Sequence, residues 1–334
     1  MADLSTHYMG LELRSPLIAA SSGLTDNFGN LKRFEEYGAG AVVLKSLFEE
    51  EIILEKEARL AKMSSPSFIY PETLEFYDYH DDADHESTHQ YLELVKKASD
   101  KLSIPVIPSI NCVTADQWTF FPRELELAGA DAIELNVFIM PSDLKRTKTE
   151  NKRLYFDIIE AVTSQVKIPV SLKISFYFSD LAIMIKKLSE TSIRGLVLFN
   201  RFYSPDIDID TLEVTSASVL SNPGDISTSL RWIAIMHDHV SCDLAASTGV
   251  HSGRDMAKMI LAGATAVEVA SAFYKNGVDY CAAILKEFSE WMDQKGYKNV
   301  KDFKGSMSQH ETGNPAAFQR VQFMKYFRGQ QSYR

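Results

Sequence analysis

Short apolar runs alternate with longer amphipathic stretches along most of this chain. Apolar runs bounded by turn residues are typical of strands buried on both faces of a parallel sheet. Eight of these runs are predicted as strands: Pro16–Ala20, Ala41–Lys45, Val106–Asn111, Ala132–Val137, Val170–Ile174, Gly195–Asn200, Cys242–Ala246 and Ala266–Ala270.

The stretches between these runs carry apolar residues at helical spacing, which predicts a helix after each strand. The predicted helices cover 29–37, 88–101, 114–128, 150–165, 179–190, 227–237, 253–262 and 277–293. Eight strand and helix repeats are typical of an α/β fold of the (β/α)8 TIM barrel type, which needs about 250 residues. A doubly wound open sheet is the alternative, but no Gly-x-Gly-x-x-Gly follows the first strand, which favours the barrel.

Two long insertions interrupt the repeat, at about 47–87 and 201–226. Both follow strand ends, so we expect them at the C-terminal face of the barrel, where active sites of this fold lie. The predicted organisation is one barrel over residues 1–293 and a C-terminal extension over 294–334. The extension is aromatic and basic at its end, and it is expected to dock as a helix or to contact another subunit.

The last two predicted strands end in small residues, at 247–250 (Ser-Thr-Gly-Val) and 269–272 (Val-Ala-Ser-Ala). Small side chains leave backbone N–H groups uncovered, and the helix predicted over 253–262 adds the positive end of its dipole. In TIM barrels the loops after strands seven and eight frequently bind phosphate. These two segments, called the anion cradle below, are therefore predicted to bind a phosphate group. The alternative is that Gly249 and Gly253 are ordinary turn glycines.

Polar side chains stand at the C-terminal ends of four other predicted strands, where they are expected to face one rim of the barrel. They are Lys45-Ser46, Asn136, Lys173 and Asn200-Arg201. Burying a lysine is costly without an anionic partner, so two lysines at one cavity indicate a ligand with distributed negative charge. A core carboxylate such as Glu134 could pair with either lysine instead. A lysine beside a flavin ring would stabilise the anionic reduced flavin, which favours a phosphate-bearing flavin over a sugar phosphate.

Composition restricts the classes of partner. The 334 residues carry a net charge of −10, which argues against nucleic-acid binding because phosphate backbones need a basic surface. No run looks like a signal peptide or reaches the roughly 20 apolar residues that span a bilayer, so a cytoplasmic protein without membrane contact is predicted. Cys112, Cys242 and Cys281 are too few and too scattered for a disulfide framework or a metal site, so no metal is expected.

Motifs spread over nearly the whole chain resemble those of one family. They are Pro-Leu-Ile-Ala-Ala-Ser-Ser-Gly (16–23), Gly-Ala-Gly-Ala-Val-Val-Leu-Lys-Ser (38–46), Glu-Leu-Asn (134–136), Leu-Lys-Ile (172–174), Ser-Thr-Gly-Val-His-Ser-Gly-Arg-Asp (247–255) and Gly-Ala-Thr-Ala-Val-Glu-Val-Ala-Ser-Ala (263–272). In this order they resemble the class 1 dihydroorotate dehydrogenases, flavoproteins of pyrimidine biosynthesis. The resemblance implies a TIM barrel, FMN as cofactor and a homodimer.

The resemblance also implies roles for individual residues. Ala20 and Ser21 would pack against the flavin, Lys173 would contact its ring, and the anion cradle would hold its phosphate. Asn136 and Asn200 would bind the amide edges of the substrate. The residues expected at the cofactor are Ala20, Ser21, Lys45, Ser46, Asn111, Asn136, Lys173, Asn200, Thr248, Gly249, Ala270 and Ser271. Those expected at the substrate are Lys45, Asn136, Asn200 and Arg201.

The resemblance fails where a catalytic base is needed. Oxidising a dihydropyrimidine requires a base that takes a proton from one carbon while hydride leaves the next. In the family this base is a cysteine in Asn-Leu-Ser-Cys-Pro-Asn, whereas this chain has Asn-Val-Phe-Ile-Met-Pro-Ser over 136–142. Ile139 or Met140 would occupy the base position, and neither accepts a proton. Ser142 is the predicted, poor substitute, and Lys45 is the second residue predicted to be catalytic.

Aromatic and titratable residues of the first insertion are alternative bases, unless they only pack a lid. They are Tyr70, Tyr77, Tyr79 and His80. Arg201 could clamp a substrate carboxylate in a bidentate fork, or it could pair with Asp206 or Asp208.

Three hypotheses follow from the sequence. The leading one is an FMN-dependent oxidoreductase that exchanges hydride between flavin N5 and dihydroorotate or a related small anionic substrate. The second is a flavin-binding protein without this activity, and the third is a lyase or aldolase in which Lys173 attacks a sugar phosphate. No cysteine cluster for an iron–sulfur centre is present in the sequence, so a small acceptor or a separate electron-transfer partner is expected to reoxidise the flavin.

Overall fold

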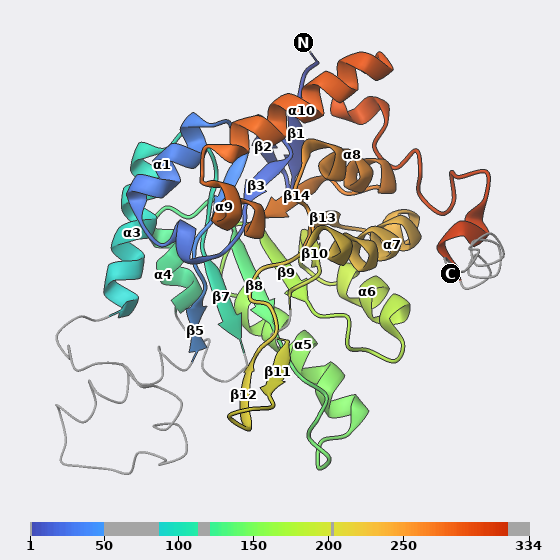
Figure 1. Ribbon diagram of the computed structural model, residues 1–334. Coiled ribbons are helices and arrows are strands. Elements are labelled where there is room, and N and C mark those ends of the chain that lie inside the picture. Colours follow the sequence, from blue (N-terminus) through green and yellow to red (C-terminus); the bar gives the residue numbers. More distant parts are fainter. Residues whose placement is uncertain (1, 50–86, 113–120, 202–203, 320–334) are drawn as a thin grey trace.

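A computed structural model describes residues 2–49, 87–112, 121–201 and 204–319. Its centre is a parallel sheet surrounded by helices (Figure 1). The central strands are β3 (Leu17–Ala19), β4 (Ala41–Val43), β5 (Leu47–Phe48), β6 (Val106–Ile107), β7 (Ser109–Cys112), β8 (Ile133–Val137), β9 (Val170–Ile174), β10 (Gly195–Leu198), β13 (Asp243–Ser247) and β14 (Ala266–Val269).

The sheet closes on itself. β4 and β5 lie in one stretch of chain, as do β6 and β7, which are separated by Pro108, a residue without a backbone N–H. β4 pairs with β6, β5 pairs with β7, and β14 pairs with β3, all in parallel. Counting each interrupted stretch as one strand gives the eight positions of the predicted (β/α)8 barrel, which is thereby confirmed.

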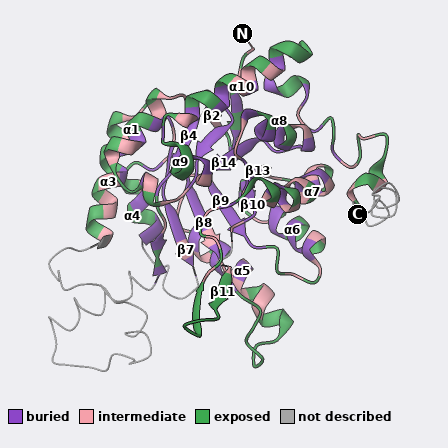
Figure 2. Cartoon of the chain, viewed as in Figure 1, coloured by how far each residue is buried: buried purple, intermediate pink, exposed green. Residues whose placement is uncertain are grey.

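Helices cover the outside of this ring and turn their apolar side inward (Figure 2). Buried residues recur at helical spacing, as Ile158, Ile159 and Val162 do in α5. The helices are α1 (Phe28–Glu36), α3 (Ser87–Lys101), α4 (Phe121–Leu127), α5 (Lys148–Thr163), α6 (Leu181–Ser189), α7 (Ile226–Met236), α8 (Gly253–Ala262), α9 (Ser271–Asn276) and α10 (Tyr280–Lys295). α9 is absent from the prediction, and residues 114–120 of one predicted helix lie outside the described residues.

An unpredicted hairpin fills the N-terminal end of the barrel. It consists of β1 (Thr6–Tyr8) and β2 (Leu11–Leu13), paired antiparallel. Tyr8 and Met9 pack among inward-facing strand residues such as Val197 and Ala266. A Cβ at Gly195 would lie 2.7 Å from the Tyr8 hydroxyl, so the close approach requires glycine. Nearby, the Asp3 N–H donates to the Lys298 carbonyl at 2.8 Å and ties the residues before the hairpin to those after α10.

The second insertion contains an exposed antiparallel ribbon of β11 (Pro205–Asp208) and β12 (Glu213–Ser216), green in Figure 2. The C-terminal extension docks on α7 and α8 through backbone hydrogen bonds from residues 305, 307 and 309. In its described part it forms two 3-10 turns, Val300–Asp302 and Pro315–Phe318, where a docked helix was one expectation. Most of the first insertion (50–86) and residues 320–334 lie outside the described residues, and none of the described helices is long and apolar enough to cross a bilayer.

Candidate active site

A cavity of about 110 Å³ lies where the C-terminal ends of β3, β9, β10, β13 and β14 meet. Both segments of the anion cradle line it, together with residues from the other strand ends. The predicted residues that the structure brings together there are Ala20, Ser21, Lys173, Asn200, Arg201, Thr248, Gly249, Ala270 and Ser271.

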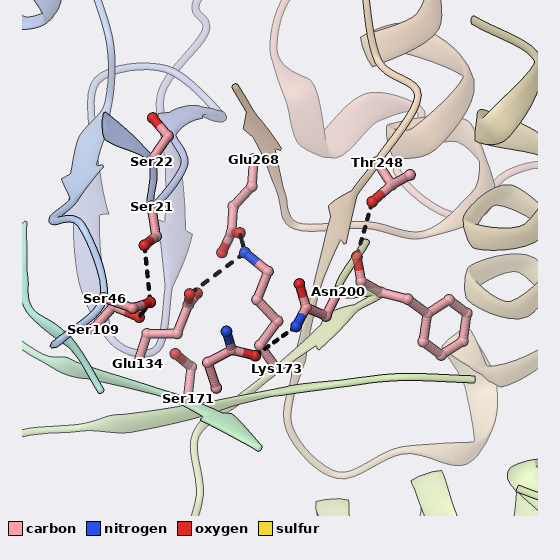
Figure 3. Close-up of polar contacts among 12 residues, drawn as sticks. Ser21, Ser22, Ser46, Ser109, Glu134, Ser171, Lys173, Asn200, Thr248 and Glu268 are labelled. Carbon is pink, nitrogen blue, oxygen red and sulfur yellow. Dashed lines mark hydrogen bonds and ion pairs between the residues drawn. The ribbon is translucent and has the colours of Figure 1, made fainter. Parts of the chain in front are cut away.

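Two further predicted residues join this group through hydrogen bonds. The Asn200 side-chain NH₂ donates to the side-chain oxygen (Oδ1) of Asn136 at 2.9 Å, and these two residues are called the amide pair below. The Ser46 hydroxyl lies 3.0 Å from that of Ser21 and 2.8 Å from that of Ser109 (Figure 3). Asn111 stands opposite Asn136 in the register of β7 and β8.

Lys45 and Ser142 lie apart from the cavity. Lys45 has an exposed side chain, and its backbone N–H donates to the Thr25 carbonyl. Ser142 is exposed in the turn before α5 and lines neither this cavity nor the adjoining one described below.

The first half of the anion cradle has an unusual backbone. Thr248 and Gly249 have φ values of 76° and 81°, so two successive residues adopt the left-handed region. A Cβ at Gly249 would lie 2.1 Å from the Ile226 backbone nitrogen, which only glycine avoids. The Thr248 hydroxyl donates to the Phe199 carbonyl at 3.0 Å and fixes the turn against β10 (Figure 3). Turns can present backbone N–H groups to an anion.

The second half of the cradle is the start of α9. The N–H groups of Ser271 and Ala272 have no acceptor in the described part of the chain, because they precede the first helical hydrogen bond. Sequence reasoning expects this contribution from α8. There, however, the Gly253 N–H donates to the Glu287 carboxylate at 2.7 Å. The Gly253 N–H at the start of α8 is thus already partnered, and the contribution of this helix to an anion site stays a prediction.

Ser221, at the end of the second insertion, is held against the cradle. Its N–H donates to the Ser271 hydroxyl at 2.9 Å, and its carbonyl accepts from the Lys275 amino group at 2.7 Å. Its hydroxyl lies 3.1 Å from His251 Nε2. Burial, followed by the charge of Lys275, lowers the pKa of His251. Sequence reasoning missed Ser221, His251 and Lys275, since no local pattern shows that the insertion folds back onto the cradle.

Lys173 lies inside the barrel between two carboxylates (Figure 3). Its amino group is 2.6 Å from Glu268 and 3.5 Å from Glu134. Burial alone would lower the pKa of Lys173, but the charges of Glu134 and Glu268 outweigh it and raise the pKa. The pairing of Lys173 with Glu134 was one alternative from the sequence and is confirmed, whereas Glu268 was overlooked.

Arg201 is held by the second insertion. Its guanidinium donates to the Ser218 and Val219 carbonyls at 2.8 and 2.9 Å and lies 3.9 Å from the Asp225 carboxylate. The suggested ion pairs with Asp206 or Asp208 are therefore wrong. Arg201 also lines a second cavity of about 340 Å³, which shares Asn200 and Thr248 with the first and adds an aromatic wall of Phe176, Tyr177 and Phe199.

The segment after Asn136 carries no proton acceptor at the expected position. Ile139 is buried and Met140 is partly exposed, and neither side chain titrates. The alternative bases Tyr70, Tyr77, Tyr79 and His80 lie outside the described residues. Among the residues that the structure describes, no group of three or more His, Cys, Asp or Glu side chains is arranged to hold a metal ion.

Comparison with known proteins shows which family this chain belongs to. The family model described as dihydroorotate dehydrogenase matches residues 3–292. The dihydroorotate dehydrogenase B (NAD(+)), catalytic subunit, of Thermoplasma volcanium is 27% identical over 321 residues, covering 91% of this chain and 98% of the relative. The protein of the same name from Methanocaldococcus jannaschii is 25% identical over 302 residues, covering 87% and 94%. The match includes every strand of the barrel and both halves of the anion cradle, and the chain therefore belongs to the dihydroorotate dehydrogenase family.

Proposed function

We propose that this protein is an FMN-dependent oxidoreductase that exchanges hydride between flavin N5 and dihydroorotate or a related small anionic substrate. Family membership supports an oxidoreductase acting on a CH–CH group. The single observation that carries the proposal is the cavity in which the anion cradle, Lys173 and Asn200 meet. Within this one cavity the cradle could contact the phosphate of FMN, Lys173 its ring and Asn200 the substrate.

The residues of this cavity fit FMN in their chemistry. The uncovered N–H groups of Ser271 and Ala272, with the Thr248-Gly249 turn, would hold the phosphate. Ala20 and Ser21 would pack on the ring, and the Lys173 ammonium would lie at its edge. The cavity is smaller than the roughly 300 Å³ at which ligand pockets begin, but the cavity of about 340 Å³ beside it shares part of its lining. Bound FMN would supply the hydride acceptor.

The substrate would bind toward the amide pair. Asn136 and Asn200 present amide groups, which match the amide edges of a dihydropyrimidine, and Arg201 carries the charge that a substrate carboxylate needs. Ser142 remains the predicted base and Lys45 a predicted contact of both flavin and substrate. Their positions outside both cavities make them the assignments to test first.

The electron acceptor belongs to the proposal as well. The relatives named above are catalytic subunits, which supports a separate electron-transfer partner for this chain. A homodimer in the cytoplasm is proposed in addition, on the family resemblance.

Two alternatives fare differently. A Schiff-base lyase needs a neutral amine, whereas Lys173 is held as an ammonium between two carboxylates, so the geometry disfavours that reaction. A flavin-binding protein without dihydroorotate activity is favoured by the apolar Ile139 and Met140 at the base position.

The test is the visible spectrum of the purified protein, followed by anaerobic addition of dihydroorotate. Flavin bands that bleach would support both cofactor and substrate. Flavin bands that persist would support the second alternative, and absence of flavin after FMN is supplied would refute the proposal.

A further inference from the structure

Three charged side chains from three strands meet inside the barrel. Glu134 lies on β8, Lys173 on β9 and Glu268 on β14. In the order of the closed sheet β8 and β14 lie on opposite sides of the ring, so the carboxylates approach the ammonium from opposite walls. Strand alternation explains the meeting, because Glu134 and Glu268 share the inward face with Ala132 and Ala266.

All three side chains are withdrawn from water. The carboxylate side chains are each 1% exposed and that of Lys173 is 8% exposed. Charges at such short distances interact more strongly inside a protein than in water, because the surrounding medium screens them less. The cluster contains two carboxyl groups and one ammonium, so Lys173 does not act as an isolated positive charge.

The two carboxyl groups are not equivalent. Glu268 is 2.6 Å from the Lys173 amino group and lines the cavity with it. Glu134 is 3.5 Å away and is not part of the cavity wall. Burial, followed by the charge of Glu268, raises the pKa of Glu134 against the attraction of Lys173. The ion pair that faces the cavity is therefore Lys173 with Glu268.

We propose that Glu268 is a positioning residue that holds the Lys173 ammonium and offsets its charge at the cavity, and that it thereby lowers the reduction potential of the bound cofactor. The inference rests on the proposed function, in which FMN occupies this cavity. An isolated ammonium would favour the reduced, anionic flavin. A carboxylate 2.6 Å from that ammonium removes much of this preference, because a nearby ion pair exerts a weaker field than a single charge.

A purely structural role for Glu268 predicts a different result. If Glu268 only neutralises a buried lysine, its replacement alters the stability of the protein and the affinity for both redox states of FMN equally. If Glu268 sets the potential, its replacement changes the ratio of the two affinities. That ratio is a thermodynamic quantity that does not depend on turnover.

The experiment measures the dissociation constants of oxidised and dithionite-reduced FMN for the wild-type protein and for Glu268→Gln. We expect the variant to favour reduced FMN at least tenfold more than the wild type does, which corresponds to a potential higher by ~30 mV for a two-electron couple. The matched control is Glu134→Gln, which removes the more distant carboxyl group from the same ammonium. Its shift is expected to be less than half as large.

Glu268→Asp is the second variant if Glu268→Gln does not fold. It keeps the charge but withdraws it from Lys173, so a smaller shift in the same direction is expected. A wild-type protein that binds FMN, with variants of unchanged or lower potential, overturns the inference and leaves the proposed function intact. A wild-type protein that binds FMN in neither redox state overturns both.

Discussion

The anion cradle and the segment 136–142 both follow strands of the same barrel, but their surroundings differ. The cradle is fixed by Thr248, by the glycine contact with α7 and by the bonds from Ser221 to α9. In segment 136–142, the first residue is hydrogen-bonded to Asn200. From Met140 to the start of α5, every residue is exposed. The proposed cofactor contacts would thus depend on packed backbone, whereas the proposed substrate chemistry would depend on side chains whose replacement leaves the barrel intact.

The largest expected effect is a loss of stability when the buried ion pair of Lys173, in the proposed cofactor cavity, is broken. Replacing Lys173 by Met leaves Glu134 and Glu268 buried beside each other without their cation. Breaking a buried ion pair costs about 3–5 kcal/mol, so urea unfolding should show a loss of that order. Lys45→Met is the control, because that lysine is exposed and should alter stability little. Equal stability of the two variants would contradict the assigned pairing.

Gly249→Ala probes the cradle itself. A side chain at this left-handed position costs about 1–3 kcal/mol and collides with Ile226. We expect lower stability together with weaker FMN binding, measured by urea unfolding and by flavin fluorescence titration. In Gly224→Ala the added Cβ has nothing within 4 Å, so that variant should behave as wild type. Similar behaviour of both alanine variants would show that the cradle is not close-packed.

Arg201→Ala tests the residues proposed to bind the substrate. Loss of its bonds to the Ser218 and Val219 carbonyls should lower stability somewhat, and we expect the binding of orotate to weaken as well. Loss of a charged hydrogen bond costs about 1.5–3 kcal/mol, so the Kd of orotate, read from the flavin spectrum, should rise at least about tenfold. FMN content should stay the same. Arg194→Ala is the control, since Arg194 is exposed before the start of β10. Loss of FMN from Arg201→Ala would mean that Arg201 contributes to FMN binding as well as to substrate binding.

The smallest effect concerns the pH dependence of the cradle. Because the pKa of His251 is lower in the folded protein, the unfolded chain binds more protons below about pH 6.5. The stability linked to His251 is therefore fully present above the unfolded pKa and declines as the pH falls toward the folded pKa. His251→Asn should reduce the difference between urea midpoints at about pH 7.5 and about pH 5.5. Part of the difference should remain, because burial also lowers the pKa of His237. An unchanged difference would exclude His251 as a contributor.

The sequence was sufficient for the elements whose signal is local. The helix over 253–262 agrees with α8 at both ends, and the eight apolar runs place β3, β4, β6 with β7, β8, β9, β10, β13 and β14 to within two residues. β5 (Leu47–Phe48) was missed, because it falls at the start of the predicted insertion. The hairpin of residues 6–13 escaped prediction because its three-residue strands are too short for a periodic pattern and their apolar contacts come from the whole chain. The ribbon of β11 and β12 also escaped prediction. Its residues are almost all exposed, so neither strand has a buried face to predict it.

Within the site, sequence reasoning located the strand ends but not the partners of their side chains. Glu268 stands between Val267 and Val269 in an otherwise apolar buried strand, and a carboxylate there needs a cation. That signal was present and could have paired Glu268 with Lys173. The fold-back of Ser221 onto α9 had no such signal, because it depends on the path of an irregular insertion.

The hairpin at the base of the barrel has a consequence for biosynthesis. Tyr8 and Met9 leave the ribosome long before Ala266, with which they share a buried cluster. The hydrogen bond from the Asp3 N–H likewise cannot form until Lys298 has been synthesised. Contacts so distant in sequence form late, because the loop between them must first be closed. We expect nascent chains that end before β14 to be cleaved by protease within their first residues, and full-length chains to resist. The hairpin would then be among the last segments to fold, and a nascent chain that ends before residue 266 would leave the base of the barrel open.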